Sequence, residues 1–404
     1  MGKFIDSILG KLGFVKAKNV GATLVNFLNG SGAIYSQYGD EIYNYEVVQQ
    51  ALHSIVTEIS KAMMTHVKMV NGEEQFIMDD VQRVLENPNP LMTMSDYLEK
   101  ITWNLLFNEN AFVWPTYGDN GKLVSLTPIQ PSEVEFRHYS DGSIWVHMWF
   151  KNDSEGEVPY SKLIHIRRKF SVNDVMGGNK YGKPDNKALL KTLKMNEMLL
   201  DNLAKALQFS MKINGVMKFK SQVNKDDQLK WLADFEKKIA EFDTAILPTD
   251  LNNEYVPINK QIQFLDQATL NFIDEKILRY WGVPVAIVKG DYTTAQYNSF
   301  YQKTLEPILI KMEQAHTKAL FTGKQNFGYG HKIRFYPEDL IHLDNDQKLK
   351  LFDLLVDSGS TWKNELRTKF GMRPDAAFNN QIAMSSNKQN AENNKTDGGV
   401  DDGE

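Results

Sequence analysis

Residues 266–322 decide the fold and read DQATLNFIDEKILRYWGVPVAIVKGDYTTAQYNSFYQKTLEPILIKMEQAHTKALFT. The first part repeats apolar residues at helical spacing, which predicts an amphipathic helix that ends at Trp281. Gly282 and Pro284 follow directly, and this pair is typical of a helix stop. The next segment, residues 288–298, is polar and rich in Gly, Thr and Tyr, which predicts a mobile loop outside the core.

A second helix is predicted from Ser299 onward, because apolar residues again recur at helical spacing through Leu320. Pro307 lies inside this helix. An interior proline removes one backbone hydrogen bond and bends the helix axis, so we expect a kink at Pro307. The stretch therefore predicts a mobile loop between two helices, the second of which is bent.

The order of short motifs in this stretch resembles the portal (head–tail connector) proteins of tailed bacteriophages. The motifs are Trp-Gly-Val-Pro at 281–284, Tyr-Asn at 297–298 and Leu-Glu-Pro-Ile-Leu at 305–309, with the polar loop between the first two. The resemblance implies that the first helix belongs to a stem, that the loop projects into a central channel, and that the kinked helix crosses a wing.

Further motifs of the same family occur in the same order, so the resemblance spans roughly residues 45–375. Asn-Pro-Asn-Pro at 87–90 precedes a helix predicted over 95–108 with Ser95 as its cap. The family's Gly-Asn-Ala-Tyr strand start follows, with Glu109 and Phe112 in place of Gly and Tyr. Residues 126–134 resemble the Leu-x-Pro segment. Residues 359–367 resemble the crown segment Gly-x-x-Thr-x-Asn-Glu-x-Arg, with Trp362 in place of Thr.

Periodicity and turn residues predict the remaining elements. We expect a helix over 45–64, a hairpin around Asn71-Gly72, strands through 110–170, a flexible passage over 176–184, a strand at 216–220, a helix over 226–242, a strand pair around 250–253, a strand within 327–337, and helices over 345–357 and 361–370.

Together these elements predict an α+β fold, which the resemblance makes a portal-type elongated subunit of a dodecameric ring around a central channel. The regions it implies are an N-terminal arm (1–44), wing (45–185), stem helix 1 (186–212), clip (213–263), stem helix 2 (264–284), channel or tunnel loop (285–298), kinked wing helix with return strand (299–340), helical crown (341–380) and disordered acidic tail (381–404).

A long helix predicted over 186–212 carries the sharpest pattern that the residues show by themselves. At about 100° per residue, five lysines fall within about 60° of one another: Lys187, Lys191, Lys194, Lys205 and Lys212. Five leucines lie on the opposite side: Leu189, Leu193, Leu200, Leu203 and Leu207. Two interpretations stay open, a solvated helix kept soluble by its lysines, or a ring of such helices with spaced charges beside DNA phosphates. Glu197 and Asp201 lie near the lysines and would weaken a grip on DNA, which suits sliding.

Composition limits the classes of protein and of site. The chain has 404 residues, a net charge of −5 and no Cys, which excludes disulfides, thiolate metal sites and Cys nucleophiles. No apolar run approaches the roughly 20 residues of a membrane span. The start is amphipathic and begins Met-Gly, but Asp6 stands where a myristoylation signal needs Ser or Thr. We therefore expect a short docking helix or arm and no membrane partner.

No motif for catalysis or for a cofactor stands out. Gly323-Lys324 lacks the rest of a phosphate-binding loop, and the eight histidines are scattered without a metal-ligand spacing. We therefore expect no cofactor, no metal and no enzymatic activity. The alternative function is a nucleic-acid-processing enzyme, a metal-dependent nuclease whose carboxylates are spread along the chain.

The resemblance implies a structural protein of the virion that forms a channel at one capsid vertex for the packaging and ejection of double-stranded DNA. The implied partners are further copies of the chain, the DNA, the large terminase, a head–tail adaptor, and the major capsid and scaffolding proteins, met first in the host cytoplasm during assembly. The candidate channel-facing residues are Lys187, Lys191, Lys194, Lys205, Lys212, Lys289, Asp291, Tyr292, Thr293, Thr294 and Gln296.

Overall fold

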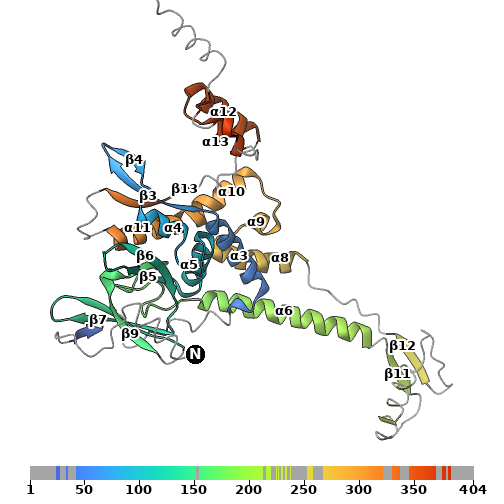
Figure 1. The fold of residues 1–404 in the computed structure, drawn as a ribbon. Coiled ribbons are helices and arrows are strands. Elements are labelled where there is room, and N and C mark those ends of the chain that lie inside the picture. Colours follow the sequence, from blue (N-terminus) through green and yellow to red (C-terminus); the bar gives the residue numbers. More distant parts are fainter. Residues whose placement is uncertain are drawn as a thin grey trace, which may run out of the picture. The chain divides into compact units, whose positions relative to one another are not determined.

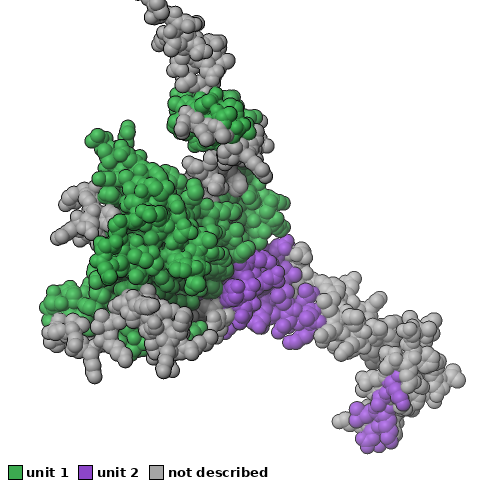
Figure 2. Space-filling view, in the orientation of Figure 1, with its two compact units in different colours: residues 1–36, 52–183, 282–404 green, residues 37–51, 184–281 purple. Residues whose placement is uncertain are grey.

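The computed structural model describes residues 24–27, 33–34, 42–151, 154–212, 215–219, 253–257, 267–321, 330–336, 345–369, 375–378 and 381–383, with a few single positions over 224–237 (Figure 1). The chain forms two compact units (Figure 2). The first comprises residues 1–36, 52–183 and 282–404, and the second comprises residues 37–51 and 184–281.

The described elements are helices and short strands, and the strands over residues 110–167 follow one another without an α-helix between them. The strands are β1 Leu24–Phe27, β2 Ala33–Ile34, β3 Met63–Val70, β4 Glu73–Phe76, β5 Asn110–Tyr117, β6 Leu123–Ile129, β7 Glu133–Tyr139, β8 Ile144–Trp149, β9 Glu155–Pro159, β10 Ile164–Arg167, β11 Gly215–Phe219, β12 Asn253–Pro257 and β13 His331–Tyr336. The helices are α3 Glu46–Ser60, α4 Asp80–Glu86, α5 Met94–Asn108, α6 Lys187–Lys212, α8 Gln267–Trp281, α9 Val285–Lys289, α10 Thr294–Phe300, α11 Glu306–Phe321, α12 Asn345–Ser358 and α13 Lys363–Lys369. A π turn, Tyr301–Leu305, joins α10 to α11.

The described strands of the first unit form three antiparallel sheets. Their orders are β1-β7-β8-β9 with β2 also on β7, β10-β5-β6, and β13-β3-β4. The predicted hairpin at Asn71-Gly72 is confirmed, since β3 pairs with β4 across these two residues and both have positive φ, 53° and 91°. In the second unit β11 pairs with β12.

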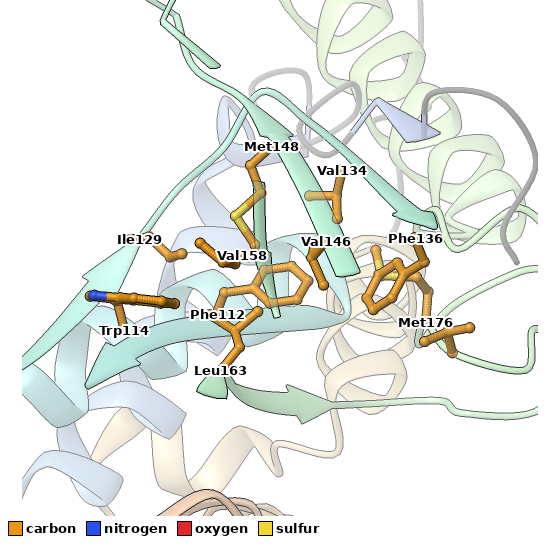
Figure 3. Close-up of a cluster of buried hydrophobic side chains, with 11 residues drawn as sticks. Phe112, Trp114, Ile129, Val134, Phe136, Val146, Met148, Val158, Leu163 and Met176 are labelled. Carbon is orange, nitrogen blue, oxygen red and sulfur yellow. The ribbon is translucent and has the colours of Figure 1, made fainter. Parts of the chain in front are cut away.

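The core of the first unit lies between two of these sheets (Figure 3). Alternate residues of the strands point into it, as the period of two in a strand requires. The cluster consists of Phe112, Trp114, Ile129, Val134, Phe136, Val146, Met148, Val158, Leu163, Val175 and Met176. The last two follow β10, so the segment after β10 is built into the core.

Three predicted helix boundaries are wrong. The helix predicted over 45–64 ends at Ser60, because Met63 and Met64 pair with β13 instead. The second error concerns the cap of α5, which is Thr93 rather than Ser95: the Thr93 side chain and Asp96 form a reciprocal capping box. Finally, α13 begins at Lys363, and Trp362 forms a bridge with Ile382. Pairing with distant segments overrides local helix propensity in the first and third cases.

Glu109 keeps the backbone conformation that its position in the motif requires. Its φ is 57°, in the left-handed region that favours glycine, and it ends α5. The side chain is buried, and its Oε1 lies 2.8 Å from Nζ of Lys169 and 3.5 Å from Nη1 of Arg168. These ion pairs offset the cost of a non-glycine residue in this conformation.

Several predicted segments lie outside the described residues. They are the N-terminal arm up to residue 23, most of the helix predicted over 226–242, residues 250–252 of the strand pair, and the tail from residue 384. The passage over 176–184, predicted to be flexible, instead folds as hydrogen-bonded turns; for example, the Asn179 N–H donates to the Lys183 carbonyl at 2.8 Å.

A buried histidine is expected to make the first unit sensitive to acid. Nδ1–H of His316 donates to the Met312 carbonyl at 2.7 Å, and Nε2 accepts from the Tyr97 hydroxyl at 2.6 Å. Burial lowers the pKa of His316 to about 4, although the bond to Met312 opposes the shift. Because this pKa lies below the 6.5 of an unfolded chain, the unfolded state binds the extra proton between pH 6.5 and 4.

We therefore expect the free energy of unfolding to fall as pH is lowered from 6.5 towards 4, by up to about 3 kcal/mol from this group. Urea titrations of the wild type and of His316→Gln at pH 7.5, 6 and 5 test this. Gln retains an acceptor for Tyr97 but does not titrate, so the variant should lose less stability on acidification. Parallel pH profiles of the two chains would contradict the assignment.

Candidate channel surface

The second unit is built on the pairing of α6 with α8. Leu189 and Leu193 of α6 are buried, as are Ile273 and Ile277 of α8. The hydroxyl of Tyr280, near the end of α8, donates to Oδ1 of Asn186 at 2.9 Å, just before α6 begins. The two helices therefore run antiparallel, with their apolar stripes against each other.

Four lysines of α6 lie exposed on the side away from this seam: Lys187, Lys191, Lys194 and Lys205. None of the four forms an ion pair with a described residue. The neighbouring acid Glu197 accepts a hydrogen bond from the Tyr45 hydroxyl at 3.1 Å. The side chain of Lys212, the last residue of α6, lies outside the described residues. The lysines thus keep their charge available to an external anion.

The apolar side of α6 is covered over only part of its length. Leu193 is fully buried, but Leu200 is 51% exposed and Leu203 is half-buried, while the side chain of Leu207 lies outside the described residues. Because α8 has 15 residues and α6 has 26, α8 packs against only part of α6. In the described part of α6 the predicted leucine face is therefore a buried seam over the first turns, at Leu189 and Leu193, and is exposed at Leu200.

Two methionines, Met195 and Met198, lie exposed among the lysines and were missed from the sequence. Their exposed fractions are 55% and 65%. Counted at about 100° per residue, both fall within about 40° of Lys191, so the same periodicity contained them. The exposed side of α6 is thus a mixture of ammonium groups, thioethers and the nearby carboxylates of Glu197 and Asp201 rather than a uniform positive stripe.

The segment after α8 is more ordered than predicted. α8 ends at Trp281, Gly282 follows at φ 76°, and Pro284 caps the short helix α9. The expected loop over 288–298 is wrong in extent, since α9 and α10 occupy most of it and leave residues 290–293 between them. The reason is a capping box in which the Thr293 side chain and Gln296 hold each other's backbone N–H.

Of the candidates in this segment, Lys289, Asp291, Thr293 and Gln296 are exposed, while Tyr292 and Thr294 are half-buried. Thr293 and Gln296 already serve the cap of α10. The α6 lysines belong to the second unit and these residues to the first, so the candidates form two separate groups on the chain.

Tyr297 anchors α10 in the first unit. Its side chain is fully buried, and its hydroxyl donates to Oε2 of Glu58 at 2.6 Å. Burial raises the pKa of Tyr297 far above its usual range, and the bond to Glu58 adds to the shift. The ring of Tyr292 lies 5.5 Å from that of Tyr297, between centroids. A hydroxyl–carboxylate hydrogen bond therefore fixes α10 to α3.

The helix that contains Pro307 continues through it. The irregularity lies one turn earlier, where Tyr301–Leu305 form a π turn and the Glu306 N–H donates to the Tyr301 carbonyl. Pro307 is the second residue of α11 and follows the π turn directly, so its missing N–H lies where the helical hydrogen-bond pattern changes. A wider turn is one way for a helix to accommodate a proline, and π turns occur often at functional sites.

Gly282 holds a position that a side chain would disturb. The Thr304 hydroxyl donates to the Gly282 carbonyl at 2.7 Å, and a Cβ on Gly282 would lie 2.6 Å from that hydroxyl oxygen. We expect Gly282→Ala to lower the free energy of unfolding by about 2 kcal/mol, through the positive φ and the clash. In urea titrations, adding Thr304→Ala should restore the stability that the clash removes but not the stability that the positive φ removes. If the stability losses of the two substitutions simply add, the clash is contradicted.

Among the described residues, no group of three or more His, Asp or Glu side chains is arranged to hold a metal ion. In that same part of the chain, no helix is long and apolar enough to span a membrane. The candidate channel residues offer a charged and partly apolar surface for binding.

Comparison with known proteins gives a family and a fold. The family model described as phage portal protein matches residues 46–371. No curated protein matches the chain. A chain from the neck of an empty gene transfer agent particle, computed with C6 symmetry, matches with a TM-score of 0.56 at 14% identity, over 86% of this chain and 97% of that chain. A chain from the neck of the native particle, computed with C12 symmetry, matches with a TM-score of 0.54 at 13% identity, over 86% and 96%.

Proposed function

The chain belongs to the phage portal protein family, and from this premise we propose that twelve copies form the channel for double-stranded DNA at one capsid vertex. The family match over most of the chain carries the proposal, and it makes the role structural rather than enzymatic. The protein is a component of the virion. DNA would enter the capsid through the ring during packaging and leave through it at ejection.

The number of subunits is supported by the neck of the native gene transfer agent particle, which was computed with C12 symmetry and contains a chain of the same fold. Identical subunits related by rotation make head-to-tail contacts, and such contacts close into a ring when the rotation divides the circle.

The exposed lysines of α6 support a channel-facing role for this helix. Lys191, Lys194 and Lys205 stand free of described ion pairs, and a Lys ammonium is a point charge on a flexible stem. Such groups attract phosphates without fixing their register, and Met195 and Met198 between them offer no hydrogen bond to DNA. Lys289, Asp291 and Gln296 are exposed and would form a second channel-facing set. Gln296 also forms the cap of α10 together with Thr293.

The remaining partners follow from the family role. We propose that the clip region, residues 213–263 with the β11–β12 pair, docks the large terminase before and the head–tail adaptor after packaging. Contacts with the major capsid and scaffolding proteins would form during assembly in the host cytoplasm.

The mass of the purified full-length protein in solution, followed by negative-stain images, tests the proposal. We expect a particle with a central hole and about twelve times the 46.3 kDa chain mass. Incubation with supercoiled DNA and Mg²⁺ should leave the DNA intact. A small species that cleaves DNA with Mg²⁺ would contradict the structural role and support a nuclease.

A further inference from the structure

The segment formed by Arg167, the last residue of β10, and the loop that follows it, residues 168–183, is held in a fixed conformation and is called here the docking loop. Oδ1 of Asn173 accepts from the N–H groups of Val175 and Met176, at 2.9 and 2.7 Å. Oδ1 of Asn110, in β5, accepts from the Gly177 N–H at 2.7 Å, and Val175 and Met176 are built into the core. Side chains and core packing therefore determine the shape of this loop.

The docking loop nevertheless presents large apolar side chains to solvent. Phe170 is 48% exposed, Tyr181 is 55% exposed and Val172 is 70% exposed. Each of the two rings also has a cation beside it: the Arg167 guanidinium lies 4.1 Å from the Phe170 centroid, and the Lys180 ammonium lies 4.8 Å from the Tyr181 centroid. Exposed apolar groups on an ordered loop are typical of a surface that a partner covers.

The charge of the docking loop is positive. It contains Arg167, Arg168, Lys169, Lys180 and Lys183 against one acid, Asp174, and the buried Glu109 pairs with two of these cations. A partner should therefore combine apolar and acidic groups. Duplex DNA meets only half of this requirement, because its phosphates match the cations while its stacked bases offer nothing to Val172 or Phe170.

The same unit carries a surface of this kind on the β3–β4 hairpin. Glu73 and Glu74 begin β4, Phe76 ends it at 53% exposed, and Met78 follows at 64% exposed. β4 pairs with β3 alone among the described strands, so no described strand covers its outer edge, and Figure 1 shows it at the edge of the sheet β13-β3-β4. Arg334 binds Glu74 at 2.7 Å, while Glu73 has no ion-pair partner among the described residues. An open strand edge with apolar side chains is a template for pairing with another chain.

We propose that the docking loop of one copy binds the β4 hairpin, residues 73–78, of the next copy around the ring. Val172 and Phe170 meet Phe76 and Met78, and the cations of the loop meet Glu73. The two surfaces differ and lie on different sheets, as a head-to-tail contact requires. This proposal rests on the ring assembly of the proposed function.

Cross-linking is a direct test, because the full-length chain has no native cysteine. The double variant Val172→Cys, Phe76→Cys is treated with a short bis-maleimide and separated on a denaturing gel. We expect a ladder of covalent oligomers that extends to the size of the ring, since every contact joins two successive copies. Each single variant should give no ladder. The matched control pairs Val172→Cys with Val124→Cys, which replaces a valine on β6 that is 58% exposed.

Charge reversal provides a second measurement that does not depend on cysteines. Lys180→Glu should raise the concentration at which rings form about tenfold, and Glu73→Lys in the same chain should restore assembly. Lys162→Glu, on the exposed turn before β10, should leave assembly unchanged.

The two failures are distinguishable. A wild-type chain that never forms rings contradicts the proposed function, whereas rings that form without the Val172–Phe76 ladder contradict the docking alone. A missing ladder overturns the docking in either case, as does an equally strong ladder from the Val124 control. Loss of DNA binding in Lys180→Glu rings of wild-type mass would assign the docking loop to DNA and also overturn it.

Discussion

Rings of chains in which Lys191, Lys194 and Lys205 are all replaced by alanine are expected to keep their wild-type mass but to hold DNA weakly. The three ammonium groups are exposed and free of described ion pairs, so their removal leaves the packing of α6 on α8 intact. Each phosphate contact that is lost should reduce the slope of log affinity against log salt by about 0.9. Filter binding of duplex DNA to purified rings across 50–200 mM salt measures this slope.

The control is a triple variant at exposed lysines elsewhere, Lys100, Lys162 and Lys318, which should bind DNA with the wild-type slope. In an infected cell, the α6 variant should package or retain less DNA than this control. Loss of ring assembly in the α6 variant would assign the lysines to a contact between subunits, and an unchanged slope would place them outside the channel.

Gly177→Ala is expected to cause the largest loss of stability among the single substitutions considered. A Cβ at this position would overlap the backbone carbonyl oxygens of Arg168 and Glu109, which cannot move aside as a flexible side chain can. The backbone of Gly177 also exchanges two hydrogen bonds with the Asn110 side chain, at 2.7 and 3.2 Å. We expect the free energy of unfolding to fall by about 3 kcal/mol or more, measured by urea titration.

Gly142→Ala is the matched control. Gly142 has φ 79° but no atom within 4 Å of the added Cβ, so only the backbone cost of about 1 kcal/mol applies. Gly177 lacks a positive φ, so its variant reports the steric term alone. Equal losses in the two variants would show that the first unit has space around Gly177. Because Gly177 lies in the docking loop, the variant should also weaken ring assembly, whereas Gly142→Ala should not.

Some structural features could have been predicted from the sequence but were not. The capping boxes Thr93/Asp96 and Thr293/Gln296 follow the spacing of three residues that defines this motif, so the start of α10 was predictable inside the supposed loop. Met195 and Met198 fall on the lysine side of α6 by the same count that grouped the lysines. In both cases the composition of the segment, polar in one and Leu-rich in the other, concealed a positional pattern.

The sequence by itself determined the elements that depend on near neighbours. Helices α6 and α8, the stop after Trp281 and the hairpin at Asn71-Gly72 follow from contacts between residues one to four apart, and the order of short motifs indicated the family. Only the tertiary structure determined that Leu193 is buried and Leu200 exposed, that the pKa of His316 is lowered, and that Gly177 has no room for a side chain. Each of these depends on atoms from segments far away in the chain, whose approach no local pattern encodes.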